Sequence, residues 1–165
     1  MSSDGRLAEL ASTLGLEQPG NEPLRWRFAH ACVHRVRHLL EDPDVEACLV
    51  VLGRYVEGSA GHPELAAAAS DAARLANRHP GSKSIDGCGH AAVSASYAVA
   101  KALQGRALEA ASYAAYAAVY AQGGAAAVAD RESFQPEFDW QLAQLRALAQ
   151  LRALAQRETA GAGPA

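Results

Sequence analysis

The sequence predicts an all-α fold, a single domain built as a bundle of about six to seven closely packed, alanine-rich helices. Alanine, which has the highest helix propensity, fills 39 of the 165 positions. No useful stretch shows the alternation of apolar and polar residues that is typical of a strand. Proline and glycine divide the chain into segments of helical length. Because alanine buries only a methyl group, we expect close helix contacts and a core that depends on a few large side chains.

Seven helical segments follow from this punctuation. They span residues 4–14, 23–41, 44–58, 63–78, 86–105, 106–122 and 136–158. Gly15 ends the first segment, and Pro23 suits the first turn of the second. The second segment ends before the Asp42-Pro43 pair, and Asp44 is the expected N-cap of the third, which ends at Gly58.

The later segments are bounded in the same way. Pro63 opens the fourth segment, and residues 79–81, His-Pro-Gly, end it. Gly105 separates the fifth segment from the sixth, Gly123-Gly124 closes the sixth, and Pro136 opens the last. The expected organisation is a short N-terminal helix and loop at 1–22, the helical bundle at 23–158 and a disordered tail at 159–165.

Composition argues against several classes of protein. The chain has 15 Lys and Arg against 18 Asp and Glu, a net charge of −3, whereas a general nucleic-acid binder usually has a basic excess. No apolar run reaches the length of about 18 residues that a membrane helix needs, and the first residues lack a signal-peptide pattern. We therefore expect a cytoplasmic protein with no nucleic-acid partner, no membrane partner and no cofactor.

The three cysteines, Cys32, Cys48 and Cys88, are odd in number and widely spaced. None of them lies at a zinc-site spacing, and a disulfide scaffold would need an even number. We interpret them as small buried hydrophobes, with a metal or redox role as the alternative.

Arg35 lies inside the apolar face of the second segment, near Leu24 and Phe28 on the helical projection. A guanidinium there should be mostly buried and paired, because an unpaired buried charge costs several kcal/mol. It either ties helices together or faces a ligand. The candidate acidic partners are Asp71, Asp86, Glu137 and Asp139.

His30, His34 and His38 recur at i, i+4 and i+8 of the same segment, which would stack them on one helix face. Such a strip is a possible site for a metal ion that prefers imidazole ligands. Arg27 and Arg37 share this face, however, and their charge repels a cation. We therefore expect a solvated polar face and no tightly bound metal.

Cys88 and His90 lie at the start of the fifth segment, and glycines flank the cysteine. A neighbouring imidazolium can lower the pKa of a thiol, so the pair is one candidate for a nucleophilic site. Glycines at a helix start more often mark close helix packing, which is the alternative.

Tyr113, Tyr116 and Tyr120 form a stripe at i, i+3 and i+7 on an alanine helix. Large rings among alanines supply core volume, and this is the expected role. A stripe that lines a ligand site is the alternative, and Tyr97 fits either interpretation.

Trp140 follows two phenylalanines at the start of the last segment. We expect its ring to dock that helix onto the bundle and its indole N–H to find an acceptor, the alternative being an exposed anchor for a partner. The hexapeptide at 143–148 recurs at 149–154 and spreads leucines over a broad face. The C-terminal half of this helix is therefore a candidate surface for a homo-oligomer.

Several short motifs, taken in order, resemble a bacterial family of alanine-rich helical proteins known as immunity proteins. An aromatic-Ala-x-x-Cys-x-x-Arg-Val pattern is matched by Phe28, Ala29, Cys32, Arg35 and Val36. Further matches are an acidic-proline turn at 42–44, an aromatic-x-x-Gly helix end at 55–58 and a Glu-x-x-Trp-Gln…Leu signature at 137–145. The segment at 90–102 resembles the family's His-Ala…Ala-Tyr-Ala-x-Lys-Ala pattern, with Ser96 before Tyr97 and two residues between Ala98 and Lys101. The resemblance covers roughly residues 24–148, and Asp86 stands where the family often has a histidine. Similar helices occur in planctomycete-type helical proteins of unknown function.

The resemblance implies a non-catalytic binding protein that neutralises a protein toxin by occluding it. The acidic stretches at 41–46 and 137–139 are the expected contacts for a basic toxin, and Glu137 and Trp140 belong to the family's closing signature. The alternative is a helical protein that binds a small molecule or a metal, with or without enzymatic activity, at a site near Arg35, Cys88 and His90.

Overall fold

The computed structural model describes residues 4–80 and 88–163, and this part of the chain is almost entirely α-helical with no strand. It contains the helices α1 Gly5–Thr13, α2 Glu22–Arg35, α3 Pro43–Val56, α4 His62–Arg78, α5 Cys88–Leu103, α6 Ala107–Ala129 and α7 Gln135–Gly161. Short 3-10 turns at 19–21, 37–39 and 131–134 precede α2, follow α2 and precede α7. The predicted all-α bundle is confirmed.

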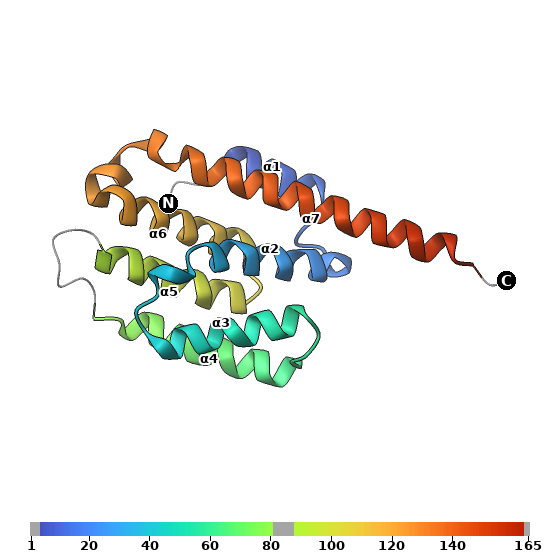
Figure 1. Cartoon of the computed structure of the whole chain (residues 1–165), viewed down its shortest axis with the longest axis horizontal. Coiled ribbons are helices and arrows are strands. Elements are labelled where there is room, and N and C mark those ends of the chain that lie inside the picture. The colour runs from blue at the N-terminus through green and yellow to red at the C-terminus, as the bar shows by residue number, and fades with distance from the viewer. Residues whose placement is uncertain (1–3, 81–87, 164–165) are drawn as a thin grey trace.

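Helix α2 lies at the centre of the packing and contacts α3, α5, α6 and α7. Helices α3 and α4 form an antiparallel pair along one side of the molecule, while α1 and α7 lie together along the opposite side (Figure 1). Helices α5 and α6 fill the space between, and they pack against each other more extensively than any other pair in the described part. The C-terminal half of α7 projects beyond the bundle (Figure 1).

The core combines a few large side chains with many alanines. The fully buried large residues include Phe28, Leu52, Phe134 and Leu145. The buried small residues of the central pair include Ala95, Ala98, Ala102, Ala107, Ala110 and Ala114. Each methyl group adds only about 0.8 kcal/mol by burial, so the large residues carry a disproportionate share of the apolar stabilisation.

The helix starts follow the predicted chemistry with one change. Pro23, Pro43, Pro63 and Pro136 all lie in the first turn of a helix, where the missing N–H costs nothing. The predicted N-cap of α3 is wrong by two residues, because the carboxylate of Asp42 accepts a hydrogen bond from the backbone N–H of Asp44 at 2.9 Å.

Helix α2 ends at Arg35, six residues before the predicted end at 41. Val36 leaves helical geometry at φ −107° and ψ 11°, and the chain continues as the 3-10 turn Arg37–Leu39. Val36 is buried, and the turn packs against α5. Tertiary contacts therefore end this helix where the sequence offers neither proline nor glycine.

Two later boundaries also differ from the prediction. Gly123 and Gly124 break α6 as expected, with Gly124 at φ +62°, but helical geometry resumes and continues to Ala129. Helix α7 reaches Gly161, so residues 159–161, expected in a disordered tail, are helical. The predicted start of the fifth helix near Asp86 lies outside the described residues.

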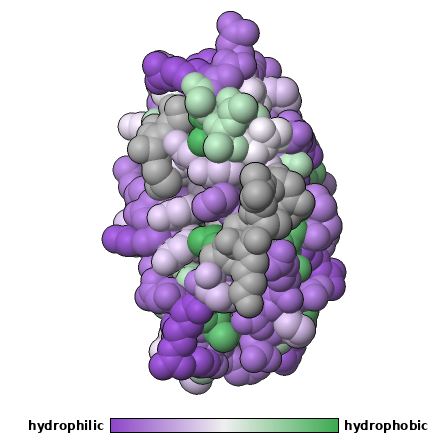
Figure 2. All heavy atoms as spheres, turned by 90° about the vertical axis from the view of Figure 1, so that its left-hand side faces the viewer, coloured by the Kyte–Doolittle hydropathy of each residue, from purple (hydrophilic) through white to green (hydrophobic). Residues whose placement is uncertain are grey.

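The surface is mostly hydrophilic at the end of the bundle where α6 meets α7. Figure 2 shows this end, where purple side chains predominate, with a pale green area near the top and smaller green areas below it. The last turns of α6 lie at this end of the molecule (Figure 1). The exposed alanines of these turns are Ala125, Ala126 and Ala129. No helix in the described part of the chain is both long enough and apolar enough to cross a membrane.

Candidate functional site

Arg35 and Glu137 join the end of α2 to the start of α7 through a bidentate ion pair. The Nε atom of Arg35 donates to Glu137 Oε2 at 2.8 Å, and Nη2 donates to Oε1 at 3.1 Å. The guanidinium carbon also lies 4.4 Å from the ring centroid of Trp140. The predicted pairing of Arg35 is confirmed with Glu137, while another of the four candidates, Asp86, lies outside the described residues.

The two members of this pair differ in burial. The Glu137 side chain is 6% exposed, whereas the Arg35 side chain is 36% exposed, so the predicted burial of Arg35 is only partial. The hydrogen bonds to Glu137 raise the pKa of Arg35. The arrangement is that of a residue that ties two helices together.

Trp140 is half-buried, and its ring packs against the main core as well as under the guanidinium of Arg35. The predicted docking of α7 by this ring is therefore confirmed. The predicted acceptor for its indole N–H is not found among the described residues. Because a cation already covers one face of the ring, this tryptophan is a poor candidate for a free partner anchor.

The predicted strip of three histidines is wrong, because α2 ends before its third member. The rings of His30 and His34 lie 5.6 Å apart, but His38 lies in the 3-10 turn after the helix. Burial, and then the neighbouring His34, lower the pKa of His30, whose Nε2 atom faces Gly53 of α3. Within residues 4–80 and 88–163, no group of three or more His, Cys, Asp or Glu side chains could hold a metal.

The tyrosine stripe divides into two aromatic groups. Tyr97 stacks on Tyr113 with centroids 5.4 Å apart, and its hydroxyl donates to Asn77 Oδ1 at 3.0 Å. Tyr116 packs edge-on against Phe134 at 4.9 Å and lies 6.4 Å from Tyr120. The four tyrosines are each half-buried, so they fill space between helices and do not line one shared cavity.

His90 is exposed, and its ring stacks on Tyr120 at 5.3 Å. The side chain of Cys88 lies outside the described residues, so the predicted pair is not tested. Cys32 and Cys48 are free and buried, which confirms their predicted role as small core residues. Arg35 pairs with Glu137 and His90 stacks on Tyr120, so these two members of the alternative site near Arg35, Cys88 and His90 have different partners.

The acidic stretch at 137–139 is occupied by internal contacts. Glu137 pairs with Arg35, and Asp139 Oδ1 accepts hydrogen bonds from Arg6 Nη2 and Gln135 Nε2, both at 2.8 Å. The hydrogen bond from Arg6 is the main reason that the pKa of Asp139 is lowered. Asp139 therefore holds α1 and α7 together, while the expectation that this stretch meets a partner stays a prediction.

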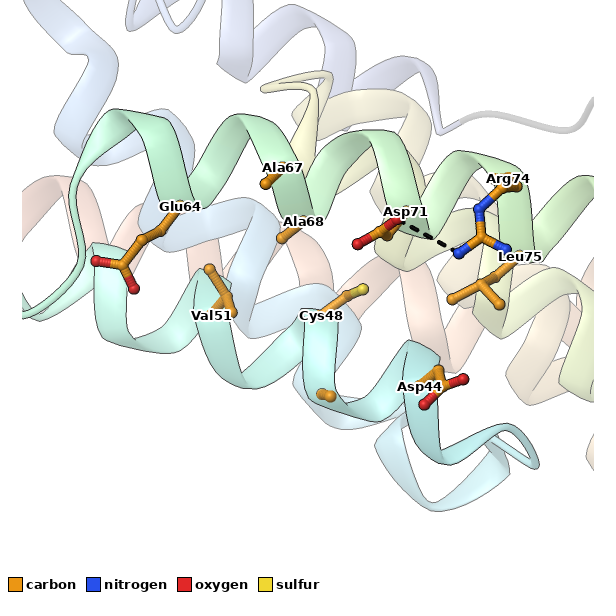
Figure 3. Close-up of a pocket in the computed structure, with 10 residues that line it drawn as sticks. Asp44, Cys48, Val51, Glu64, Ala67, Ala68, Asp71, Arg74 and Leu75 are labelled. Atoms are coloured by element: carbon orange, nitrogen blue, oxygen red, sulfur yellow. Dashed lines mark hydrogen bonds and ion pairs between the residues drawn. The ribbon is translucent and has the colours of Figure 1, made fainter.

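The acidic stretch at 41–46 leads into a groove between α3 and α4 that the sequence reasoning missed. The groove has a volume of about 490 Å³. It is lined by alanines and other small or apolar side chains, with charged residues at its edges: Asp44, Ala47, Cys48, Val51, Glu64, Ala67, Ala68, Asp71, Arg74 and Leu75. Figure 3 shows Cys48 and Val51 between the two helices, with Glu64 at one end and Asp71 and Arg74 toward the other.

The edges of the groove carry more negative than positive charge. Asp71 pairs with Arg74 at 3.3 Å, and Glu64 pairs with Arg54 at 3.3 Å. Asp44 is exposed and makes no ion pair within the described part of the chain. Cys48 lies at the floor with 7% of its surface exposed, and burial followed by the nearby Asp71 raises the pKa of its thiol.

One sequence signal could have indicated the groove. Asp44, Cys48 and Val51 recur at helical spacing on α3, and Ala67 and Asp71 recur at i and i+4 on α4. Alanine is so frequent in this chain, however, that such a row does not stand out. The groove could therefore not be predicted without knowing that α3 packs against α4.

The comparisons with known proteins add no relative: no family model matches the chain, and no curated protein or solved structure is significantly similar to it.

Proposed function

We propose that this chain is a non-catalytic helical binding protein of the immunity type, and that it neutralises a protein toxin by covering part of the toxin surface. The proposal places the toxin contact at the groove between α3 and α4. The occupant is a basic segment of the toxin that presents small or apolar side chains to the groove and cationic side chains to its edges. The family-like motifs described above are the second reason for the proposal.

The observation that carries the proposal is the charge and shape of this groove. Its floor is apolar and formed by small side chains, so the backbone of a partner segment can approach closely. Asp44 offers a carboxylate that no cation in the described part neutralises. Complementary charge of this kind favours fast association and selects against acidic partners.

Three other carboxylates of the two acidic stretches are less suitable as partner contacts than Asp44 is. Glu137, Asp139 and Glu46 all pair with arginines of the chain itself. Binding a partner there would first break an internal ion pair. At Asp44 no such pair has to be broken.

The test is co-expression with the protein encoded by the adjacent gene, where that product arrests growth. We expect growth to be restored and the two purified proteins to form a complex measurable by calorimetry. Asp44→Lys should weaken binding by roughly tenfold or more, because it reverses a charge at the contact. Glu158→Lys, a matched reversal on the exposed end of α7, should bind like the unaltered protein.

Three results would decide against parts of the proposal. Failure to protect, together with no complex, contradicts the immunity role. A complex that is equally insensitive to Asp44→Lys and Glu158→Lys contradicts the placement at the groove. Equal weakening by both variants shows that only net charge matters, which also contradicts the placement.

A further inference from the structure

Three aromatic rings from three different helices meet at the end of the bundle where α3 ends and α4 begins. Trp26 of α2 and Tyr55 of α3 have centroids 5.4 Å apart and planes at 73°, so one ring meets the other edge to face. His62, the first residue of α4, continues the group at 5.4 Å from Tyr55 and 57° to it. The Tyr55 hydroxyl and His62 Nδ1 are 3.4 Å apart and share a hydrogen bond.

These rings line a hollow of about 500 Å³ that is separate from the α3–α4 groove. Steeply inclined rings form a corner, so a group placed in it lies close to the faces of two π systems at once. The remaining lining residues are Glu22, Pro23, Arg27, Val56, Glu57, Gly58, Ala60 and Gly61. Gly58 has a φ of +83° and open space around it, so no side chain covers that edge of the hollow.

The charges around the hollow favour a cation. Glu22 lies 3.8 Å from Arg25, a long and partly exposed pair, and Glu57 is exposed and makes no ion pair within the described part of the chain. Arg27 is the single arginine of the lining, and it opposes them. Within the lining itself two carboxylates stand against one guanidinium, but Arg25 outside the lining offsets Glu22. Glu57 is therefore the carboxylate that remains for a ligand cation between the aromatic walls.

We propose that this hollow binds an alkylated ammonium group. The negative face of an aromatic ring attracts a cation within about 6 Å, tryptophan most strongly, and methyl groups on the nitrogen add apolar contact with the rings. The same chain already holds a cation over its other tryptophan, since the guanidinium of Arg35 lies 4.4 Å from the Trp140 centroid. At Trp26 no cation of the described residues occupies the ring face, so a ligand can take that position.

The inner edge of the site is held in place by packing. The benzo edge of Trp26 lies against Gly105, where a Cβ atom would come within 3.3 Å of the ring. Gly105 itself has a φ of +73°, which favours glycine. The Trp26 ring is therefore fixed before any ligand arrives, and pre-organisation of this kind lowers the entropic cost of binding.

The experiment titrates the full-length protein with choline and with its neutral isostere 3,3-dimethylbutan-1-ol, using calorimetry. Both probes have the same shape, so a difference in affinity measures the contribution of the charge. We expect choline to bind at least roughly tenfold more tightly than the alcohol. Equal binding of the two probes, or no binding of choline, overturns the proposal.

Two exposed charge variants test the placement without disturbing the core. Glu57→Gln should weaken choline binding by about threefold or more, and Arg27→Gln should strengthen it, because they remove opposite charges from the same hollow. Glu158→Gln, on the far end of α7, is the matched control and should change nothing. If Glu57→Gln and Arg27→Gln shift the affinity in the same direction, the site is not at this hollow.

Phosphatidylcholine vesicles identify the source of the group. Flotation of the protein with these vesicles, lost on Glu57→Gln, assigns the site to a lipid headgroup. Binding of free choline without flotation assigns it to a small molecule or an alkylated side chain. This site does not depend on the toxin proposal, since Asp44→Lys should leave choline binding unchanged.

Discussion

Replacing Arg35 by methionine should unfold this protein at a markedly lower temperature, because the substitution leaves Glu137 buried without a counter-charge. Methionine keeps most of the length and volume of the arginine stem, so little packing is lost. What disappears is the bidentate contact at 2.8 and 3.1 Å and the cation over the Trp140 ring. The Glu137 side chain, at 6% exposure, has almost no access to water in compensation.

The magnitude follows from the burial of the two partners. Breaking a buried ion pair by removing one member costs about 3–5 kcal/mol. The Arg35 side chain is 36% exposed, so solvent already screens part of the attraction, and the lower end of that range applies. Loss of the ring contact adds about 0.5–1 kcal/mol. A total of about 3–4 kcal/mol lowers Tm by roughly 6–16 °C in a chain of 165 residues.

The assay is thermal and urea unfolding, followed by circular dichroism, of four proteins that form a double-mutant cycle. They are the unaltered chain, Arg35→Met, Glu137→Met and the double variant. Because two apolar side chains can replace a buried ion pair at little cost, the double variant should be more stable than Arg35→Met alone. The coupling free energy should be about 2 kcal/mol or more.

Two outcomes would refute this reasoning. If the Tm of Arg35→Met lies within about 2 °C of that of the unaltered protein, buried Glu137 does not need Arg35 as a counter-charge. Strictly additive effects of Arg35→Met and Glu137→Met would mean that the two side chains do not interact in solution.

Three further predictions concern other parts of the molecule. Burial and then His34 lower the pKa of His30, so neutral His30 should stabilise the fold above the ordinary histidine pKa of about 6.5, and this stabilisation should be lost as the pH falls toward the folded-state pKa. In urea unfolding between about pH 7 and 5, His30→Gln should therefore lose less stability on acidification than the unaltered protein. Gly105→Ala should destabilise the protein by about 1–2 kcal/mol in urea unfolding, because the new Cβ atom would sit at a φ of +73° and press against the Trp26 ring. The same change should weaken choline binding, and an unchanged urea midpoint would contradict the expected strain at Gly105. Burial and the Asp71 carboxylate raise the pKa of the Cys48 thiol, so its alkylation by iodoacetamide should be at least roughly tenfold slower than that of an exposed thiol, and faster in Asp71→Asn. Peptide mass spectrometry measures the rate, and a rate like that of free cysteine would place Cys48 outside the groove floor.

Much of the fold could be predicted because local chemistry sets most of its helix ends. Proline in the first turn and glycine after the last turn act within a few residues, and the sequence shows them directly. The end of α2 could not be predicted, because buried Val36 and the packing of the following turn decide it. The wrong helix end also made the predicted position of His38 wrong, because that position required α2 to continue to residue 41.

The candidate sites depended more on long-range geometry. The need of Arg35 for a partner could be predicted from its place in an apolar face, but the choice of Glu137, 102 positions away, could not. The groove at Asp44 and the hollow at Trp26 each lie between helices, and the residues that line them form no recognisable motif in the sequence. The pairing of α3 with α4 forms the groove, and the packing of the start of α2 against the end of α3 and the following turn forms the hollow.

The close contact between α5 and α6 limits how this sequence can vary. At a buried alanine such as Ala98 or Ala110, a larger side chain has nowhere to go, and overpacking costs about 1–3 kcal/mol. Exchange for glycine lowers helix propensity by about 1 kcal/mol, so alanine is the residue that fits these positions best. Serine also fits where its hydroxyl can donate to a backbone carbonyl, as Ser96 does to Ala92. The repetitive composition of this region is therefore a geometric requirement of two helices at short distance, and its residues should resist substitution even though each contributes little by itself.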